Sequence, residues 1–288
     1  MKKFVALMYH SLGDYQGNTY NIDINNFKDQ IFWLKAEGYI VEGFRGFIKR
    51  KGTNKWPERY ALLSFDDGYK SFLKAADILN GIGFTGTFFV TKDWCKNRRN
   101  FLSDLEIKEL GSTQEIGSHT LSHPHLPKIP QESIHYELFE SKKWIEDIIQ
   151  GHTHSLSVPG GSINSKVIKT ALEVGYKLIG NSKEWWNHMD YTLSSNVVNR
   201  VAIRRSYSLD TFKHIVNINI NFFLKRRIRA YLLYLPKSIL SDQQIRKINK
   251  LLSSEFIITP QSNRIGYRLL GPKIKHSKKS DIISEGGA

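Results

Sequence analysis

Short apolar runs alternate with amphipathic segments along most of the chain. The runs at 60–63 and 84–90 are rich in Leu, Phe, Val and Thr, and their length and composition predict buried strands. Between such runs, apolar residues recur at helical spacing, as at Phe27, Ile31 and Leu34. The same patterns predict further strands at 4–8, 39–41, 114–117, 154–158, 176–179 and 201–203, a basic loop at 49–57, and further helices at 72–79, after Ser103, at 134–149, at 164–173 and after Ser208.

This alternation of strands and helices indicates the fold class. Strands separated by helices pair in parallel through right-handed crossovers, which makes this an α/β protein. About seven such units are expected, and that number favours a distorted or incomplete (β/α) barrel over an open sheet. In a barrel of parallel strands, the functional residues gather at the carboxyl ends of the strands.

The chain divides into three expected parts. Residues 1–215 carry the alternation and form the expected barrel domain. Residues 216–272 are expected to be a helical, basic C-terminal extension, in which the stretch 222–234 interleaves apolar and basic residues. Such a helix can pack on the barrel with its charged face outward, which we favour, or lie on an anionic membrane surface. The polar tail at 273–288 is expected to be disordered.

The chain is strongly basic, and this charge bears on its partners and location. Lys and Arg total 42 against 27 Asp and Glu, a formal net charge of +15. The excess indicates either an anionic partner or a solvated basic face. No recognised nucleic-acid-binding motif accompanies the charge, so specific nucleic-acid binding is not expected. The apolar run 4–8 is too short for a signal peptide, and the expected location is the cytoplasm, with peripheral membrane contact as an option.

Paired carboxylates and paired imidazoles each follow a predicted strand. Asp66 and Asp67 are neighbours at a strand end, so their side chains point in different directions. One carboxylate can therefore bind a metal ion while the other stays free as a base. His119 and His123 follow another strand, and their i, i+4 spacing brings both rings onto one face if the segment coils. Three protein ligands with an open position are typical of a hydrolytic metal site.

Each of these motifs has a simpler interpretation when it is taken alone. An Asp-Asp-Gly sequence is most often a turn, and an isolated histidine pair can simply lie on the surface. The sequence Pro159-Gly160-Gly161 would likewise be an ordinary turn. The joint pattern, in this order and at predicted strand ends, favours one shared site over separate turns.

The joint pattern resembles the signature of the polysaccharide deacetylases, carbohydrate esterase family 4. Residues 64–68 read Ser-Phe-Asp-Asp-Gly and are similar to the first family motif. Residues 119–123 read His-Thr-Leu-Ser-His and are similar to the second. The segment 156–161 resembles the Arg-x-Pro-x-Gly loop of the family, with Ser157 where the family often has Arg.

Two further stretches are similar to the branch of this family that acts on exopolysaccharides, namely 7–10 and 27–39. The resemblance covers roughly residues 1–215 and implies a distorted (β/α) barrel, in agreement with the pattern of elements. It also implies an N-acetylated glycan as substrate and one divalent metal ion as cofactor. Zinc is the expected ion, and cobalt or nickel would also suit these ligands.

The resemblance implies a role for individual residues. In the family the first Asp of the motif is the base and the second binds the metal ion, so Asp66 is the expected general base. Asp67 then joins the two histidines of the second motif as a metal ligand, and such an ion would lower the pKa of bound water to about 7. The Pro159-Gly160 turn would approach the substrate, and the N–H of Gly160 would share the oxyanion charge.

The acid that protonates the leaving amine has two candidates. The late Leu-x-His strand end of the family has no clean copy near the C-terminus, and His214 falls in an amphipathic helical pattern. His10 instead ends a predicted strand, so we expect His10 to be the acid, with the terminal strand moved to the front by circular permutation. Because Ser157 replaces the Arg of the family, Arg200 or Arg204 is expected to orient the base.

The expected function is therefore metal-dependent removal of N-acetyl groups from amino sugars in a polysaccharide, an oligosaccharide or a lipid-linked glycan precursor. The alternative is a catalytically inactive barrel that binds glycan in a polysaccharide synthesis complex. The free carboxylate of Asp66 argues against this alternative, because binding alone would not need it. Nucleic-acid binding would rest on charge alone.

Overall fold

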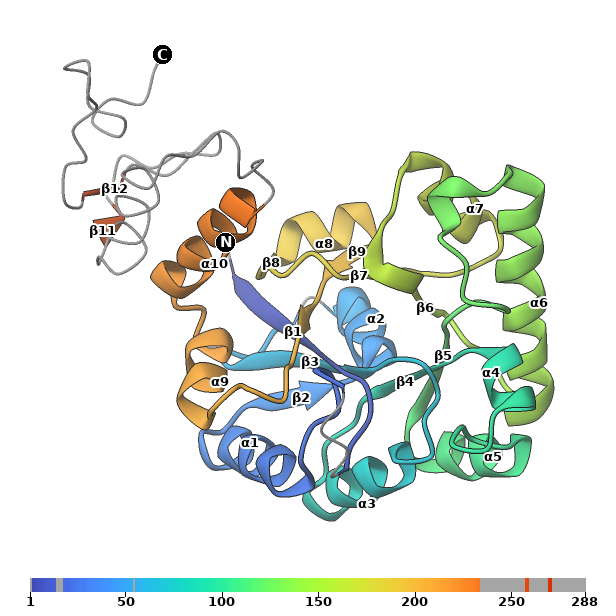
Figure 1. The fold of residues 1–288 in the computed structure, drawn as a ribbon, viewed down its shortest axis with the longest axis horizontal. Helices are drawn as coiled ribbons and strands as arrows, with labels where there is room; N and C mark the ends of the chain where they lie inside the picture. The colour runs from blue at the N-terminus through green and yellow to red at the C-terminus, as the bar shows by residue number, and fades with distance from the viewer. Residues whose placement is uncertain (1, 14–17, 54, 234–256, 259–268, 271–288) are drawn as a thin grey trace. The chain divides into compact units, whose positions relative to one another are not determined.

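Strands and helices alternate along the structure and build a barrel. The computed structural model describes residues 2–13, 18–53, 55–233, 257–258 and 269–270. The chain divides into two compact units, Met1–Ile218 and Asn219–Ala288, and the first unit contains the barrel (Figure 1). Its strands are β1 (Lys3–Tyr9), β2 (Ile40–Glu42), β3 (Tyr60–Phe65), β4 (Thr87–Val90), β5 (Glu115–Ser118), β6 (Ser155–Ser157), β7 (Leu178–Asn181), β8 (Asn187–His188), β9 (Val197–Asn199) and β10 (Val201–Ala202). Its α-helices are α1 (Ile24–Ala36), α2 (Phe44–Thr53), α3 (Phe72–Ile82), α4 (Lys92–Asn97), α5 (Asp104–Thr113), α6 (Gln131–Ile149), α7 (Ser165–Glu173), α8 (Met189–Ser195) and α9 (Leu209–Val216).

The sheet is mainly parallel and curls almost into a closed barrel. Its hydrogen-bonded path runs β10-β1-β3-β4-β5-β6-β7-β9, with β2 pairing to β3 and β8 pairing antiparallel to β1. The two ends of the path, β9 and β10, are consecutive in the chain and are separated by Arg200 alone. One bent segment therefore pairs with β7 on one side and with β1 on the other. This confirms the predicted barrel, with one strand more on the path than the pattern indicates.

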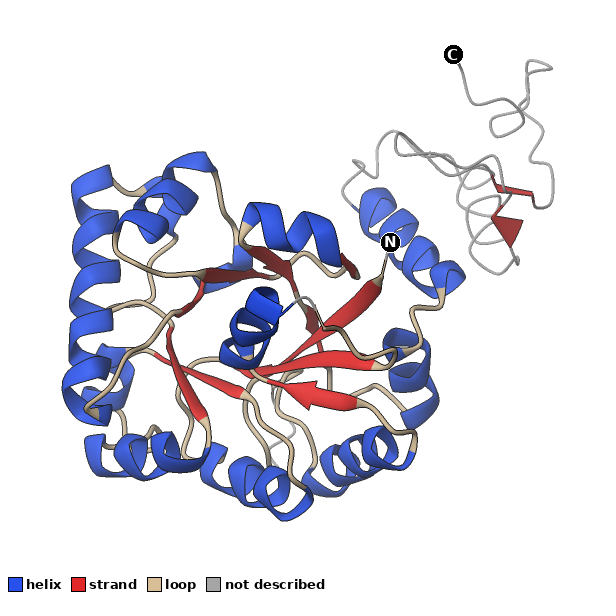
Figure 2. Cartoon of the chain, turned by 180° about the vertical axis from the view of Figure 1, so that it is seen from behind, coloured by secondary structure: helices blue, strands red, loops and turns tan. Residues whose placement is uncertain are grey.

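The interior of the barrel is apolar near the amino ends of the strands and polar near their carboxyl ends. Side chains alternate between the two faces of each strand, so every second residue points inward. The apolar cluster consists of Phe4, Ala6, Phe44, Phe47, Tyr60, Leu62, Phe89, Leu178, Met189 and Val198. Phe44 and Phe47 belong to α2, which lies across this end of the barrel (Figure 2). The opposite end remains open for the polar site.

Helix α2 corrects the predicted loop at 49–57, because the helix continues through the first residues of that range. Only two residues of the helix are buried, so its sequence has the polar pattern that is typical of a loop. Its first N–H groups donate into the barrel: Phe44 donates to Thr87 Oγ1 at 2.7 Å and Arg45 donates to Glu115 Oε2 at 2.6 Å. The first N–H groups of the helix are thus bonded to residues far away in the sequence and not to a capping residue beside them, so the local sequence does not indicate where the helix begins.

The other helices of the first unit lie around the outside of the barrel (Figure 1). A second apolar cluster joins α6 and α7 to the outer face of the sheet through residues such as Leu138, Leu156 and Val167. The predicted helices correspond to α1, α3, α5, α6, α7 and α9, and the predicted strands correspond to β1–β7 and β10. Four short elements, α4, α8, β8 and β9, were not predicted. Segments this short contain too few residues to show the apolar periodicity of a helix or a strand.

The second unit is described in part. Helix α10 spans Ile220–Leu233, and β11 (Ile257–Ile258) pairs antiparallel with β12 (Leu269–Leu270). Most of the expected extension at 216–272 and the whole expected tail at 273–288 lie outside the described residues. The contact of the extension with the barrel or with a membrane therefore stays a prediction. In the part of the chain that the structure describes, no helix combines the length and apolar character needed to cross a membrane.

Candidate metal centre

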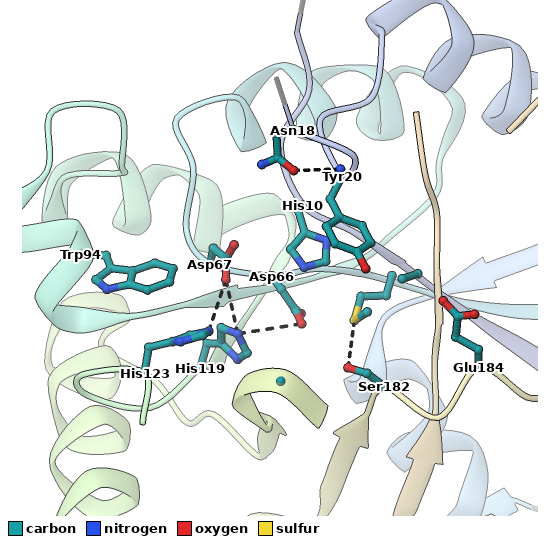
Figure 3. A pocket seen from close by; sticks show the side chains of 13 residues that line it. His10, Asn18, Tyr20, Asp66, Asp67, Trp94, His119, His123, Ser182 and Glu184 are labelled. Carbon is teal, nitrogen blue, oxygen red and sulfur yellow. Dashed lines mark hydrogen bonds and ion pairs between the residues drawn. The ribbon is translucent and has the colours of Figure 1, made fainter. Parts of the chain in front are cut away.

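One cavity collects most of the predicted site residues at the carboxyl ends of the strands (Figure 3). Its volume is about 390 Å³. His10 directly follows β1, Asp66 and Asp67 follow β3, and His119 follows β5. These strands lie within one stretch of the path, β1-β3-β4-β5, so their carboxyl ends deliver side chains to one place. The lining residues are Met8, His10, Asn18, Tyr20, Asp66, Asp67, Trp94, His119, His123, Gly160, Ser182, Glu184 and Ala202.

Asp67, His119 and His123 form a compact set of ligand atoms. Asp67 Oδ1 lies 3.4 Å from His119 Nε2 and 3.7 Å from His123 Nε2. Ligand atoms at about 2.0–2.2 Å from a tetrahedral ion are about 3.3–3.6 Å apart, so the two distances from Asp67 are close to those of a zinc site. All three ligand atoms lie within 4.8 Å of one another. One carboxylate and two imidazoles also suit cobalt and nickel. Within the described residues, no other group of three His, Cys, Asp or Glu side chains converges in this way.

Hydrogen bonding and burial prepare both imidazoles to bind a cation. His119 Nδ1 donates to the carbonyl oxygen of Ser157 at 2.8 Å, which leaves Nε2 with its lone pair on the side of Asp67. Burial lowers the pKa of His123 to about 4, so this ring is neutral at neutral pH. Burial also opposes protonation of His119, but the charges of Asp66 and Asp67 outweigh it and raise the pKa of His119. The same negative field would attract a metal ion.

The loop from His119 to His123 is an irregular turn, which corrects the prediction that a coiled segment aligns the two rings. Thr120 has a φ of 69° and His123 a φ of 65°, and Asp67 also has a positive φ of 90°. Such left-handed backbone costs about 1–3 kcal/mol for a residue other than glycine. The turn is closed by two short-range bonds, from the Thr120 N–H to Ser118 Oγ and from the His123 N–H to Thr120 Oγ1. It brings the ring centroids to 4.8 Å.

Asp66 lies beside the ligand set and is held by an arginine. Nη1 and Nη2 of Arg200 donate to its two carboxylate oxygens at 2.7 and 2.8 Å. Ser157 Oγ donates to Asp66 Oδ2 at 2.9 Å and accepts from Arg200 Nη2 at 2.7 Å. Burial opposes the ionisation of Asp66, but the charge and hydrogen bonds of Arg200 outweigh it and hold the pKa of Asp66 well below its usual 3.8. The two neighbouring carboxylates thus have different partners.

Of the two arginines proposed to orient the base, Arg200 has the contact. Arg200 binds Asp66, whereas Arg204 Nη2 pairs with Glu184 at 3.0 Å. Arg200 follows β9 at the bend where the barrel closes, and its side chain is fully buried. A Cβ atom on Gly180 would lie 2.7 Å from Arg200 Nε, so the glycine in β7 makes room for the guanidinium. The arginine that binds the base therefore lies in the segment that closes the barrel, between β9 and β10, and not in the third motif.

His10 lines the cavity from the end of β1. Its ring stacks on Tyr20 with centroids 4.8 Å apart, and its buried Nδ1 makes no hydrogen bond to any residue that the structure describes. Burial lowers the pKa of His10, although the charges of Asp67 and Asp66 act in the opposite direction. The ring forms part of the cavity wall and can therefore contact a bound substrate. The other candidate acid, His214, lies in α9 and is not among the lining residues.

The third motif contributes Gly160 to the cavity wall, while the neighbouring Pro159 is buried and is not among the lining residues. Gly160 has a φ of 64°, which glycine adopts without strain. This turn therefore brings backbone, with no side chain, to the edge of the cavity.

Several residues of the wall were not predicted, namely Asn18, Tyr20, Trp94, Ser182 and Glu184. Trp94 stacks on His123 with centroids 4.3 Å apart and so covers one face of that ring. Tyr20 covers His10 in a similar way. These residues come from loops and from the short helix α4. The sequences of such segments show no periodic pattern that would predict a functional site.

Comparison with known proteins shows which family the central part of the chain resembles. Residues 53–179 match the family model described as polysaccharide deacetylase. A curated peptidoglycan-N-acetylglucosamine deacetylase of Bacillus cereus is 27% identical over 148 residues, which are 49% of this chain and 67% of that protein. A poly-beta-1,6-N-acetyl-D-glucosamine N-deacetylase of Staphylococcus epidermidis is 25% identical over 187 residues, 65% of this chain. The match spans 55% of the length of that second relative.

A solved structure shares the fold of the first unit. The deacetylase PplD of Streptococcus pyogenes, in complex with acetate, superposes with a TM-score of 0.68 at 22% identity. The match covers 74% of this chain and 98% of that one. The family match includes both the Asp-Asp motif and the histidine motif, so the resemblance inferred from these motifs is confirmed.

Proposed function

Because residues 53–179 belong to the polysaccharide deacetylase family, we propose that this protein is a metal-dependent hydrolase of N-acetylated glycans. It removes N-acetyl groups from amino sugars in a polysaccharide, an oligosaccharide or a lipid-linked glycan precursor. The proposal rests on one observation above all, the ligand set of Asp67, His119 and His123 with Asp66 held beside it. Both curated relatives are named as N-acetylglucosamine deacetylases, which supports this class of substrate.

The ligand set would hold one divalent ion, for which zinc is favoured and cobalt or nickel also suits the donors. When bound, such an ion polarises the acetyl carbonyl and lowers the pKa of a water molecule. Asp66 stays outside the ligand set because both of its oxygens are engaged by Arg200. Its carboxylate remains ionised, since Arg200 lowers its pKa, and it accepts the proton of the attacking water as general base.

The second half of the reaction is the departure of the amine, for which His10 is the proposed acid. His10 lies in the wall of the cavity, where its ring can bond to the leaving nitrogen. Burial lowers the pKa of His10, while the charges of Asp67 and Asp66 act in the opposite direction. As the acid, a protonated His10 would donate its proton to the leaving amine. The N–H of Gly160 is proposed to share the oxyanion charge.

Acetate release from a panel of N-acetylglucosamine oligomers, with and without a chelator, tests the proposed function. We expect acetate to be released and the release to stop when the metal ion is removed, because the ion supplies the carbonyl polarisation. Release that resists chelation would contradict the metal dependence. Oligomer binding without any acetate release would instead support the alternative, a catalytically inactive glycan-binding barrel.

The metal content of ligand variants provides a first prediction. The purified protein is expected to carry about one divalent ion per chain, and His119→Ala or His123→Ala is expected to lose it, since two protein ligands hold zinc poorly. Elemental analysis after gel filtration gives the stoichiometry. His125→Ala is the matched control, because this exposed histidine of the next turn is not in the ligand set. Full occupancy in the His119→Ala, His123→Ala double variant would refute the site.

A second prediction concerns the acid. His10→Ala is expected to slow amide substrates by about 10²–10⁴-fold and to leave an activated phenyl acetate almost unaffected, because a phenoxide departs without a proton. Metal content should stay normal, since His10 is not a ligand. The measurement is the ratio of amide to ester turnover over a pH range that extends well below about 6.5, because burial lowers the pKa of His10 from that ordinary histidine value. His214→Ala is the control, and a selective amide defect in that variant alone would assign the acid to α9.

A further inference from the structure

Helix α6 carries a carboxylate that holds the loop between the two ligand histidines. Glu137 Oε2 accepts hydrogen bonds from the N–H groups of Leu121 and Ser122, both at 2.9 Å. Its other oxygen, Oε1, accepts from Ser122 Oγ at 2.5 Å. Glu137 is 9% exposed, so its carboxylate is nearly buried against the donors of this loop. A buried carboxylate with three such donors is bound to them tightly.

The same face of α6 holds the start of the loop. Ser141, one helical turn after Glu137, lies with its Oγ 2.8 Å from Ser118 Oγ. Ser118 Oγ in turn accepts the N–H of Thr120, which is the first of the two left-handed residues. Two side chains of one rigid helix therefore fix the backbone on both sides of the turn that presents the histidine rings.

We propose that Glu137 is a positioning residue for the metal centre. It holds Leu121 and Ser122 in place, and so keeps the strained backbone of His123 in the conformation that brings its Nε2 to Asp67. The proposal rests on the proposed metal site, because the position of His123 matters only if the ring binds an ion. Glu137 touches neither the ligand atoms nor the cavity, and it acts through the backbone alone.

Substitutions at this position separate geometry from charge. In Glu137→Gln, the amide oxygen can accept both backbone N–H groups, and the amide nitrogen can donate to Ser122 Oγ, which as a hydroxyl can accept. The three contacts survive and the negative charge is lost. In Glu137→Ala all three contacts are lost, and the two N–H groups have no acceptor. Glu137→Asp keeps the charge but is too short by one methylene to reach the same donors.

Cobalt binding to the metal-free protein measures the effect directly, because bound Co²⁺ has a visible spectrum that reports the affinity and geometry of the site. Glu137→Ala is expected to weaken Co²⁺ binding by about 10–100-fold and to alter the spectrum, as for other groups that orient metal ligands. Glu137→Gln is expected to match the parent in both. Glu132→Ala is the control, since Glu132 is exposed on the same helix. Thermal unfolding of each metal-free variant confirms that it is folded at the assay temperature.

Each outcome decides the proposal. Parental Co²⁺ affinity and spectrum in folded Glu137→Ala would overturn it, and so would a loss in Glu137→Gln equal to that in Glu137→Ala, which would assign the effect to charge. If Glu137→Ala does not fold, Glu137→Asp is measured in its place. Weaker Co²⁺ binding is again expected, and parental affinity and spectrum would again overturn the proposal. A parent that binds no cobalt would overturn the metal site itself, and the positioning role with it.

Discussion

Asp66→Asn is expected to lower the turnover of N-acetylated substrates by about 10²–10⁴-fold while the protein keeps its metal ion. The amide cannot accept a proton from water as the carboxylate does, and this is the step assigned to Asp66. The ligand set is unchanged, because Asp66 Oδ2 lies 4.0 Å from His119 Nε2 and faces Arg200 and Ser157. Turnover and metal content are measured on the same preparation.

Asp67→Asn is the matched comparison, since it is the same change on the neighbouring residue. Asp67 Oδ1 lies within 3.7 Å of both histidine nitrogens, so this variant is expected to lose metal affinity and turnover together. Equal loss of metal in the two variants would mean that the roles of base and ligand are not divided as proposed.

Arg200→Met is expected to reduce the free energy of unfolding by about 3–5 kcal/mol, because it leaves a buried carboxylate without its counter-charge. Arg200 is fully buried and Asp66 is 3% exposed, so water cannot replace the lost partner. Urea unfolding at neutral pH measures the difference from the parent. Arg204→Met is the control. Arg204 pairs with Glu184 at a site where its side chain is 38% exposed, and about 0–1 kcal/mol is expected there. Similar losses in both variants would contradict the buried pair.

The same pair predicts how stability depends on pH. Arg200 lowers the pKa of Asp66 in the folded protein, so the contribution of the pair is present above the usual pKa of 3.8 and is lost as the pH falls through the lower folded value. The stability difference between the parent and Arg200→Met should therefore shrink below about pH 4. In the variant, burial still raises the pKa of Asp66 and the lowering effect of Arg200 is gone, although the charges of His119 and His10 remain. The pKa of Asp66 should then be higher than in the parent, and the acidic limb of the activity profile should move to higher pH. An unmoved limb would show that Arg200 does not set the protonation of the base.

The barrel and the ligand residues could be predicted because their signals are local. Apolar runs of strand length and amphipathic helices between them define the alternation, and parallel pairing follows from it. Asp66 and Asp67 are adjacent at the end of β3, so their divergence follows from the geometry of a strand. His10 could be associated with them only by assuming that β1 is a barrel strand, and β1 does pair with β3.

The support of the site could not be predicted from local patterns. Arg200 lies 134 positions from Asp66 and 43 from Ser157, and its place depends on the bend that closes the barrel and on Gly180. The turn at Thr120 is left-handed because distant α6 side chains hold it, whereas the histidine spacing alone favours a helix. In both cases the decisive partners come from the tertiary structure.

The central claim is that one metal ion on Asp67, His119 and His123 is required for de-N-acetylation. The most direct test is to titrate the metal-stripped protein with Zn²⁺ while acetate release from an N-acetylglucosamine oligomer is measured. We expect no acetate release before zinc is added, a release rate that rises linearly with added zinc, and a plateau at about one equivalent per chain. The His119→Ala, His123→Ala double variant should stay inactive through the same titration. Full acetate release by the stripped protein before any zinc is added would contradict the account.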